Sequence, residues 1–540
     1  MLVSHFKKGA TPRESQRFIL DKMETLLKSG YKRFIVSAPT GSGKSHVAGA
    51  LADALGSTFI VTSTKQLQDQ YVRDFPEMAV IKGKSNFECH QLMKREHIGE
   101  KRRALQKGLT CEKGQCMTKR GGKVVATCEF KAPNPDGQCV YYKQKEEGLA
   151  RPRTILNYAL YFYLKKFQSD SAGIDRQVTI FDEAHTIESE VVRFVGYDIP
   201  GGYLAETGLD QRRFDIESVR GMLGLLGSLK DAYAELIRRS HEPVTTADVV
   251  RMRRLDRRLD GVVNASRDIG RDEDNFIMQE PEFDAQGNLS RISAVPLDIS
   301  SYTRDLLDSE IQVFMSATID RDNFSKSIGM ENCVLIDVPK SPFPAENRMV
   351  EFRNTARLSS RSPESDEIRV ANSIDNIMAA HQDSRGLILT SSKARCYNLL
   401  KRLSRRQASR IQVAHSKNQD NTSLGDILDA HGTTPNGVLL SSSLWQGIDL
   451  KGDLSRFQII EKCPYPYLGD SRVAAKNRAD RSWYVYQTIV KLLQGLGRSV
   501  RDDDDHADTY VMDSAVQELL RRHRTMVPAA YHDVLFAQQT

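Results

Sequence analysis

The sequence predicts an α/β protein built on doubly wound parallel sheets, with helices on both faces of each sheet. The apolar run Phe34–Ser37 is short enough for a buried strand, and a loop of small residues and then the helix-like stretch Val47–Leu55 follow it. A second apolar run, Gln177–Phe181, ends directly at the acidic pair Asp182 and Glu183. Because 540 residues are too many for one core, we expect two large domains plus insertions.

The loop after the first strand has the composition of a phosphate-binding loop. Small residues let backbone N–H groups turn toward phosphate oxygens, Lys44 adds a positive charge, and the Ser45 hydroxyl can ligate magnesium. The expected nucleotide contacts are Ala38, Pro39, Thr40, Gly41, Ser42, Gly43, Lys44 and Ser45. The loop therefore predicts a site for ATP and Mg²⁺.

The acidic pair at the end of the second strand fits the same site. We expect Asp182 to hold Mg²⁺ through water, and Glu183 to orient and deprotonate the water that attacks the terminal phosphate. His185 is not expected to bind zinc, because no second histidine follows it at helical spacing. A surface Asp-Glu pair that caps a helix is the alternative for these residues alone, but it does not explain the strand before them.

Composition and charge narrow the class of protein. The chain is 40% hydrophobic and 27% charged, and no apolar run approaches the ~20 residues of a membrane span. The N-terminus lacks an apolar signal core, so we expect an intracellular protein, cytoplasmic in a prokaryote or virus and nuclear in a eukaryote. The net charge is +7, yet Lys82–Arg153 alone holds 17 Lys and Arg against 8 Asp and Glu. This local excess indicates either a polyanion partner or a solvated basic face.

Five of the eight cysteines fall within 51 residues, which indicates a metal centre rather than disulfides in an intracellular chain. They are Cys89, Cys111, Cys116, Cys128 and Cys139. Four thiolates suit either zinc or an iron–sulfur cluster. The tight Cys-x-x-Cys pairs of zinc modules are absent, and the wide spacings favour the larger cluster slightly. Cys333, Cys396 and Cys463 are expected to be ordinary core residues.

Further motifs follow in order and resemble those of superfamily 2 helicases. These are Gln312–Thr318 with its Ser-Ala-Thr, the strand Gly386–Ser392, Val438–Leu450 and Gln494–Arg501. The most similar group is the XPD and DinG family of iron–sulfur DNA helicases. The motifs that resemble those of this family are Pro12–Gln16, Leu156–Tyr158, Ser341–Pro344, Lys462–Tyr467 and Asp505, together with Gly83–Cys89 and Cys139–Tyr142. In that family the last two motifs bracket the cluster domain. Gln446 and the fifth cysteine depart from the family pattern.

This resemblance implies two RecA-like motor domains with ATP in the cleft between them. Motor domain 1 is expected at 1–85, 150–200 and 296–345, and motor domain 2 at 346–540. Two insertions are expected in motor domain 1, an iron–sulfur cluster domain at 86–149 and a helical arch domain at 201–295. Apolar residues at helical spacing support the arch helices: Met222, Leu225, Leu226, Leu229, Tyr233, Leu236 and Ile237, then Val249, Met252, Leu255, Leu259 and Val262. Their polar faces carry Arg251, Arg253, Arg254, Arg257 and Arg258, which either close over single-stranded DNA or are solvated.

The resemblance also implies roles for single residues. Arg498 and Arg501 are expected to contact the phosphates as arginine fingers. Gln494 is expected near the γ-phosphate or the attacking water, Gln16 near the adenine, and Asp449 at the nucleotide. A [4Fe-4S] cluster is expected on Cys89, Cys116, Cys128 and Cys139. Cys111 competes with Cys116 for one position, and we favour Cys116 because Gly114 and Gln115 before it allow a close approach of the backbone.

The implied activity is ATP-dependent translocation 5′ to 3′ along single-stranded DNA, with unwinding of forked duplex in repair or replication. The hydroxyl- and amide-rich segment Val61–Gln66 suits contacts to backbone phosphates, and nothing indicates base-specific readout. Two other classes stay open: a translocase that strips bound proteins without unwinding, and a structural ATPase subunit that remodels a complex. A motor that fails on naked forked duplex but displaces a bound protein would be the first of these.

Overall fold

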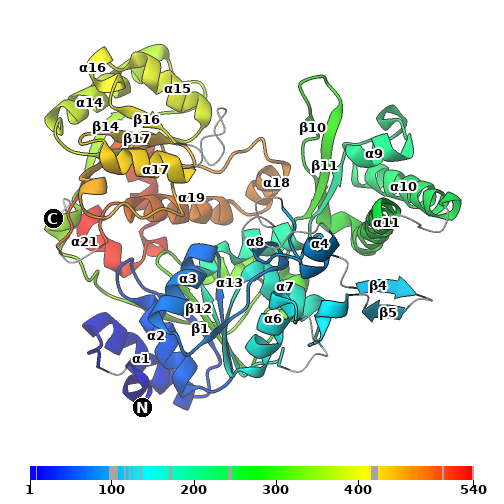
Figure 1. Cartoon of the computed structure of the whole chain (residues 1–540). Coiled ribbons are helices and arrows are strands. Elements are labelled where there is room, and N and C mark those ends of the chain that lie inside the picture. The colour runs from blue at the N-terminus through cyan, green and yellow to red at the C-terminus, as the bar shows by residue number, and fades with distance from the viewer. Residues whose placement is uncertain are drawn as a thin grey trace.

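Two parallel-sheet domains and two insertions make up the chain. The computed structural model describes residues 1–7, 9–95, 108–114, 117–120, 123–126, 128–133, 137–169, 173–240, 246–414, 424–501 and 504–537. Domain 1 forms the lower part of Figure 1 and domain 2 the upper left, while the insertions project from domain 1 on the right. The expected α/β class with two doubly wound domains is confirmed. Among the described residues, no helix is long and apolar enough to cross a membrane.

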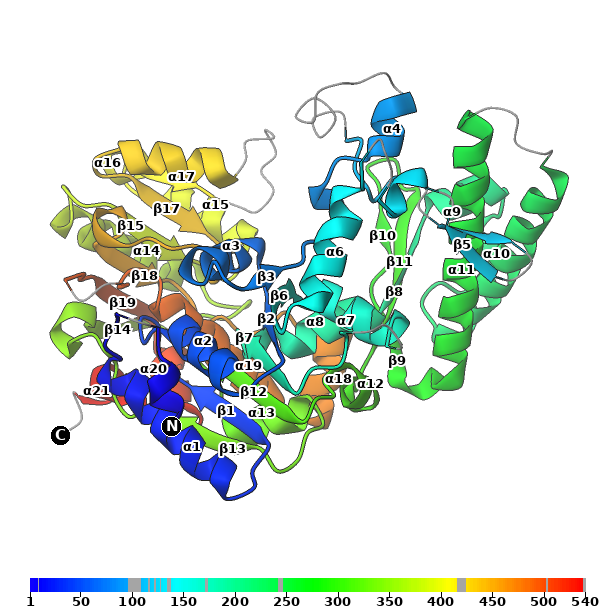
Figure 2. The same ribbon diagram turned by 60° about the horizontal axis from the view of Figure 1, so that its bottom comes forward.

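Domain 1 is organised around a seven-stranded sheet in which all paired strands run parallel. In spatial order the strands are β13 (Val334–Asp337), β1 (Arg33–Ser37), β12 (Ile311–Ser316), β7 (Val178–Asp182), β2 (Thr58–Thr62), β6 (Arg153–Asn157) and β3 (Ala79–Val80). Helices α1 (Glu14–Lys28), α2 (Lys44–Ala54), α3 (Lys65–Asp74), α7 (Tyr158–Phe167), α8 (Ile187–Val195), α12 (Ser300–Leu306) and α13 (Arg321–Ser327) surround it (Figure 2). The central strands are buried on both faces and rich in β-branched and aromatic residues, as parallel strands between helices must be.

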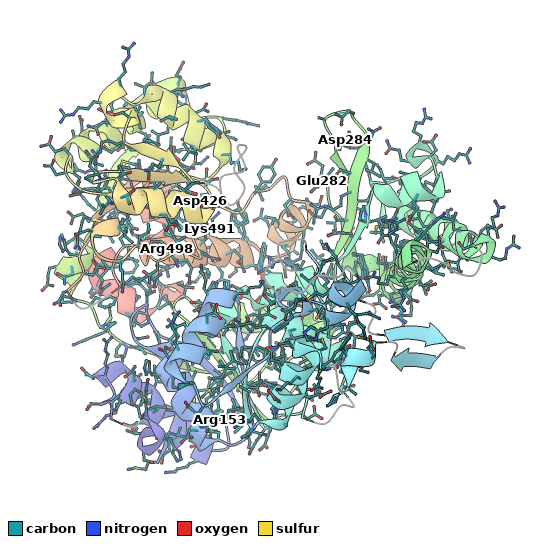
Figure 3. All side chains as sticks on the ribbon, in the orientation of Figure 1. Arg153, Glu282, Asp284, Asp426, Lys491 and Arg498 are labelled. Atoms are coloured by element: carbon teal, nitrogen blue, oxygen red, sulfur yellow. The ribbon has the colours of Figure 1, made fainter. Side chains whose placement is uncertain are left out.

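Domain 2 has a six-stranded sheet, again with parallel pairing throughout. In spatial order its strands are β14 (Val350–Ala356), β19 (Asp508–Asp513), β18 (Phe457–Ile460), β15 (Gly386–Leu389), β17 (Val438–Ser441) and β16 (Ile411–Val413). Its helices are α14 (Glu364–Ala380), α15 (Lys393–Arg402), α16 (Arg405–Ala408), α17 (Leu424–Thr433), α18 (Ser471–Ala479), α19 (Arg481–Leu496), α20 (Ser514–Arg522) and α21 (His532–Leu535). Helix α19 runs along the boundary with domain 1, where Figure 3 labels Lys491 and Arg498.

The first insertion, here the cysteine insertion (86–149), has little regular structure among its described residues. Its elements are α4 (His90–Arg95), the hairpin β4 (Met117–Arg120) and β5 (Lys123–Ala126), and α6 (Val140–Ala150). Helix α6 returns the chain to β6, and Gly148 in its last turn lets it approach Ile81 closely. A small buried cluster centred on cysteines replaces a conventional core.

The second insertion contains the expected helices, but it is not purely helical. Helices α9 (Gly202–Thr207), α10 (Val219–Arg239) and α11 (Thr246–Arg271) are accompanied by an antiparallel sheet of β8 (Tyr197–Pro200), β9 (Phe276–Met278), β10 (Glu282–Phe283) and β11 (Leu289–Pro296). Because β8 pairs with β11, β8 belongs to the second insertion. The insertion therefore begins before residue 201, the first residue expected from the sequence. Two strands of only two and three residues give too little alternation to be recognised from sequence. The β10–β11 hairpin projects beside α9–α11, and Glu282 and Asp284 mark it in Figure 3.

The arginine-rich face of α11 is partly used inside this insertion. Arg254 lies 2.9 Å from the Glu206 carboxylate, and Arg258 pairs with the same carboxylate. The Arg258 guanidinium also lies 4.6 Å from the centre of the Tyr203 ring. These two cations therefore stabilise the packing of α11 on α9.

One buried carboxylate joins domain 1, domain 2 and the root of the second insertion. Glu188, on α8, accepts hydrogen bonds of 2.7 Å from Arg472 Nη2 and from Trp483 Nε1, both in domain 2. The Lys476 ammonium lies 3.4 Å away. Arg472 in turn donates to the Pro296 carbonyl at the end of β11, 2.8 Å away. Since Glu188, Arg472 and Trp483 are removed from water, loss of one partner would leave the others buried without their hydrogen bonds.

We predict that Glu188→Ala lowers the free energy of unfolding by about 3–5 kcal/mol, because it leaves buried Arg472 without its counter-charge. Glu188→Gln keeps an acceptor and should cost less. Urea denaturation followed by tryptophan fluorescence measures the effect, since Trp483 is one of two tryptophans.

Glu190→Ala is the matched control on the same helix. Among the described residues, Glu190 forms an ion pair with Arg193 one turn away, at 3.2 Å, and that arginine is exposed. The expected cost is below about 1 kcal/mol. Equal costs for Glu188→Ala and Glu190→Ala would show that the network across the domains contributes nothing to stability.

Candidate functional site

The phosphate-loop residues lie at the carboxyl end of β1, between that strand and helix α2. Gly41 and Gly43 adopt φ angles of 79° and 73°, a left-handed backbone that suits glycine. Lys44 Nζ donates to the carbonyls of Ala38 and Pro39, at 3.0 and 3.4 Å, so the ammonium points into the loop. The Ser42 hydroxyl donates to the same Pro39 carbonyl at 2.7 Å. The segment is a compact turn with its charge directed inward.

Gln16 contacts this loop from helix α1. Its Oε1 accepts a hydrogen bond from the Arg13 N–H, at 2.8 Å, and its Nε2 donates to the Gly43 carbonyl, at 3.3 Å. Arg13 Nη1 donates to the Gly41 carbonyl, at 2.8 Å. A Cβ on Gly43 would lie 2.1 Å from Gln16 Nε2, so only glycine allows this approach. The structure thus joins Gln16 to the phosphate loop, as its expected nucleotide role requires.

Asp182 and Glu183 lie at the carboxyl end of β7. Asp182 is buried, and its Oδ1 accepts the Glu183 N–H at 3.0 Å. Burial and the Glu183 charge raise the pKa of Asp182 to about 6. Burial also acts to raise the pKa of Glu183, but its electrostatic interactions with His185 and with the cations Lys44, Arg498 and Arg501 outweigh it and lower that pKa. Glu183 has a φ of 52°, rare for a residue other than glycine, and such strain is concentrated at functional sites.

These two carboxylates fit a bound magnesium ion. Glu183 Oε2 is buried and has no hydrogen-bond partner among the described residues, although His185 Nδ1 lies 3.3 Å away. A hard dication with its water shell suits adjacent carboxylate oxygens of this kind. Ser45, in the first turn of α2, is the hydroxyl on the phosphate-loop side.

His185 connects the acidic pair to two other motifs. Its Nδ1 lies 2.9 Å from Ser316 Oγ at the end of β12, and its Nε2 lies 3.5 Å from Gln446 Nε2 in domain 2. Burial lowers the pKa of His185, which favours the neutral ring. A neutral imidazole can donate from one nitrogen and accept at the other, so His185 can bridge both partners. Gln446, the residue that departs from the family pattern, thus contacts His185 from domain 2.

The motif at the end of α19 faces the same site from domain 2. Gln494 Nε2 donates to Thr318 Oγ1 across the domain boundary, at 3.0 Å. Arg498 is buried and donates to the Ile448 carbonyl at 2.6 Å. Arg501 pairs with Asp449, whose carboxylate lies 3.2 Å from Arg501 Nε. Both arginines are close enough to Glu183 to lower its pKa, and Arg498 Nη2 donates to Gln494 Oε1 at 3.3 Å. The structure therefore brings the residues predicted to be catalytic together: Lys44, Asp182, Glu183, Gln494, Arg498 and Arg501.

Phe343, for which the sequence analysis predicted no role, lies against the phosphate loop. A Cβ on Gly41 would fall 2.0 Å from Phe343 Cζ, so the ring rests directly on this glycine. Phe343 belongs to the segment that connects β13 of domain 1 to β14 of domain 2. In the sequence, Phe343 stood out only as a member of the motif Ser341–Pro344, which resembles the XPD and DinG family.

The described cysteines of the cysteine insertion share one buried cluster. Cys111 Sγ lies 3.5 Å from Cys139 Sγ and donates to the Glu88 carbonyl at 3.0 Å. Cys89 and Cys128 are buried in the same cluster. A Cβ on Gly114 would fall 2.6 Å from Cys89 Sγ, so glycine leaves room for that sulfur.

The thiols interact strongly. Hydrogen bonding from Cys111 lowers the pKa of Cys139 to about 6 and that of Cys89 to about 7, and the same contacts raise the pKa of Cys111. Backbone N–H groups at the start of α6 add to the effect at Cys139. Thiolates rather than thiols bind metals, so the surroundings suit a soft metal centre.

The position of Cys116, the ligand that the sequence favoured, lies outside the described residues. Cys111, its competitor, is 1% exposed and in contact with Cys139. Among the described residues, no group of three or more His, Cys, Asp or Glu side chains has the spacing of a metal site.

Comparisons with known proteins agree with this arrangement. The model of the "Helicase C-terminal domain" family matches residues 374–532, and that of "Type III restriction enzyme, res subunit" matches 9–197. "ATP-dependent DNA helicase YoaA" of Haemophilus influenzae is 22% identical over 89% of this chain and 87% of its own length. The Escherichia coli protein of the same name is 21% identical over 94% of this chain and 92% of its length.

Solved structures show the same fold. A structure of an XPD helicase superposes with a TM-score of 0.62 at 16% identity, covering 96% of this chain and 98% of its own. S. tokodaii Xpd4 gives 0.56 at 16% identity, with 94% and 97% covered. The resemblance to XPD/DinG-like superfamily 2 helicases and the two RecA-like domains are confirmed.

The contact between Phe343 and Gly41 leads to a stability prediction. Gly41→Ala should destabilise the protein for two reasons, the positive φ and the overlap with the ring. The first costs ~1–2 kcal/mol, and the second adds ~1–3 kcal/mol. In a Phe343→Ala background only the first cost should remain, as measured by urea denaturation.

Gly30→Ala isolates the backbone cost. Gly30 has a φ of 89°, and a Cβ there would have nothing within 4 Å. We expect Gly30→Ala to cost the same with Phe343 or Ala at position 343. If Gly41→Ala also costs the same in both backgrounds, the ring does not press on the loop.

Proposed function

We propose that the chain is an ATP-dependent DNA helicase that moves 5′ to 3′ along single-stranded DNA and unwinds duplex DNA during repair or replication. The observation that carries the proposal is the convergence of Lys44, Glu183 and Arg498 from two RecA-like domains on one site. The relatives named as ATP-dependent DNA helicases support the reaction class. The direction of movement rests on the resemblance to the XPD and DinG family.

ATP would bind to groups that are hydrogen-bonded to one another in this structure. Lys44 would exchange the carbonyls of Ala38 and Pro39 for phosphate oxygens, which are stronger partners because they carry charge. Arg498 and Arg501 would neutralise the opposite side of the transferred phosphoryl group. Since these arginines come from domain 2, hydrolysis requires the domains to be together.

Magnesium would neutralise phosphate charge and fix the geometry of the phosphates when bound. Ser45 and Asp182 would hold it from the two sides of the cleft at the sheet edge. Glu183, ionised because of the cations around it, would orient the attacking water. Gln494, held by Thr318, would sense whether the domains are closed.

The cysteine insertion would hold a [4Fe-4S] cluster, as the resemblance to the XPD and DinG family implies. We propose Cys89, Cys111, Cys128 and Cys139 as its ligands. Their shared buried cluster, the Cys111–Cys139 contact and the space left by Gly114 support this set. This choice replaces Cys116, which the sequence favoured, with Cys111.

The basic excess of the cysteine insertion supports a nucleic-acid partner, single-stranded or forked DNA. Lys84 Nζ lies 5.5 Å from the ring centre of Tyr141 and 5.9 Å from that of Tyr142, and Lys131 Nζ lies 5.6 Å from the Tyr142 ring. Burial, together with the charges of Lys84 and Lys131, lowers the pKa of Lys145. Lys84 and Lys131, with aromatic rings beside them and Lys145 nearby, suit a phosphate backbone and its bases. Lys82 differs, since it pairs with Asp69 at 2.6 Å.

Strand displacement on 5′-tailed and 3′-tailed duplexes tests the function. We expect ATP- and Mg²⁺-dependent unwinding of the 5′-tailed substrate only. Lys44→Ala should abolish unwinding by weakening nucleotide binding. Glu183→Gln should bind nucleotide normally but lose about 10²–10⁴-fold in turnover, because a neutral amide neither orients the attacking water as a carboxylate does nor accepts its proton.

Glu310→Gln is the matched control, because Glu310 is an exposed carboxylate of domain 1 paired with Lys32. It should behave as wild type. Unwinding of the 3′-tailed duplex would reverse the proposed direction. No unwinding of either substrate, with ATP-driven displacement of a bound protein, would indicate the translocase instead.

Serine replacements test the cluster ligands. Changes at Cys89, Cys111, Cys128 and Cys139 should each lower iron and acid-labile sulfide content and weaken visible absorbance, because a cubane that loses a thiolate ligand becomes labile. Cys116→Ser should keep both. The readout is metal content of the purified protein, so it does not depend on activity.

Cys333→Ser, outside the insertion, is the control and should not change the iron content. A colourless Cys116 variant with an iron-loaded Cys111 variant would restore the ligand set favoured by sequence. Zinc in place of iron in the wild type would contradict the iron–sulfur assignment itself.

A further inference from the structure

We propose that Tyr71 is a positioning residue of the nucleotide site, because its hydroxyl fixes the orientation of the Asp182 carboxylate. Since Tyr71 lies on α3, it also links the segment Val61–Gln66, which is expected to contact DNA, to the proposed magnesium site. Nothing in the sequence marks this tyrosine, which lies seven residues after Thr64. The inference rests on the proposed function, because it takes Asp182 as a magnesium ligand.

The contact itself is specific. Tyr71 is completely buried, and its hydroxyl donates to Asp182 Oδ2 at 3.0 Å. The other oxygen, Oδ1, accepts the Glu183 N–H at 3.0 Å. Each carboxylate oxygen therefore keeps one lone pair for a ligand while the protein occupies the other. Since the terminal torsion of an aspartate is otherwise broad, these two bonds determine the plane of the carboxylate.

Helix α3, which carries Tyr71, is held against the phosphate-loop side of domain 1. One turn after Tyr71, the Phe75 ring packs so closely on α2 that a Cβ on Gly49 would fall 2.3 Å from it. The His46 ring, two residues after Lys44, lies 5.7 Å from the Phe75 ring. Tyr158, at the start of α7, donates to the Asp182 carbonyl at 3.0 Å. Asp182 is thus fixed through its side chain from α3 and through its backbone from α7.

The other end of α3 faces the expected DNA contact. Thr64 caps the helix by accepting the Leu67 N–H at 3.2 Å, and it belongs to the hydroxyl-rich segment Val61–Gln66. Seven residues of helix span ~10 Å. Because the hydrogen-bonded helix moves as a unit, a phosphate bound near Thr64 would act on the Tyr71–Asp182 bond. Binding of single-stranded DNA would then alter the orientation of the Asp182 carboxylate, and so the magnesium site, through Tyr71.

Tyr71→Phe tests the inference, since it removes one hydroxyl and leaves the ring. The probes are Mn²⁺, followed by its electron paramagnetic resonance signal in the presence of ADP, and a fluorescent ADP analogue. Loss of a group that orients a metal ligand typically costs about 10–100-fold in metal affinity. We expect Mn²⁺ affinity to fall by that factor and metal-free nucleotide affinity to stay unchanged. Single-stranded DNA should shift Mn²⁺ affinity in the wild type and much less in the variant.

Tyr161→Phe is the matched control: Tyr161 is buried on α7 and packs edge-on against Phe181, with ring centres 5.5 Å apart. It should leave Mn²⁺ affinity unchanged. Wild-type Mn²⁺ affinity in Tyr71→Phe, or an equal loss in Tyr161→Phe, overturns the inference. Asp182→Asn distinguishes failure of the inference about Tyr71 from failure of the proposed function. If Asp182→Asn binds Mn²⁺ as the wild type does, the assignment of Asp182 to the metal is overturned as well.

Discussion

The parallel pairing of β1, β12 and β7 is the constraint on which the nucleotide site depends. Ser37 pairs with Ser316, and Met315 pairs with Asp182, so three motifs from distant parts of the sequence end at one sheet edge. The Ala38 N–H continues the ladder by donating to the Ser316 carbonyl at 2.9 Å. A slip of one residue in this register would turn Asp182 to the opposite face of the sheet and separate it from the phosphate loop.

Two of the sets of contacts between the domains differ in burial and strength. The Glu188 network involves a buried carboxylate, two cations and an indole N–H, and its disruption would leave charges without partners. The contacts at the nucleotide site, Gln494 to Thr318 and Gln446 to His185, involve neutral groups, and the second is 3.5 Å long. Neutral hydrogen bonds exchange easily for water or ligand. The Glu188 network therefore suits a pivot, and the site contacts suit a surface that opens and closes.

The sequence predicted the features that depend on local pattern. The strand–loop–helix around Lys44, the strand that ends at Asp182 and the amphipathic α10 are each encoded within some 20 residues. The β8–β11 sheet, Glu188, Phe343 and Tyr71 could not be predicted, because their partners lie far away in the chain. Tyr71 and Asp182 are 111 residues apart, and Glu188 and Trp483 are 295 apart.

The charges around Glu183 bear on what this residue contributes to hydrolysis. A general base works best when its pKa lies near the operating pH, and burial alone would have raised the pKa of Glu183 in that direction. Interactions with His185 and with the cations Lys44, Arg498 and Arg501 lower it instead, so Glu183 is a weak base in the arrangement with both domains together. Phosphoryl transfer through a loose transition state needs little proton abstraction before the P–O bond breaks. Under the proposed function, positioning of the water by a carboxylate held at a φ of 52° would therefore be the larger contribution, and strong basicity would be given up for neutralisation of the phosphates.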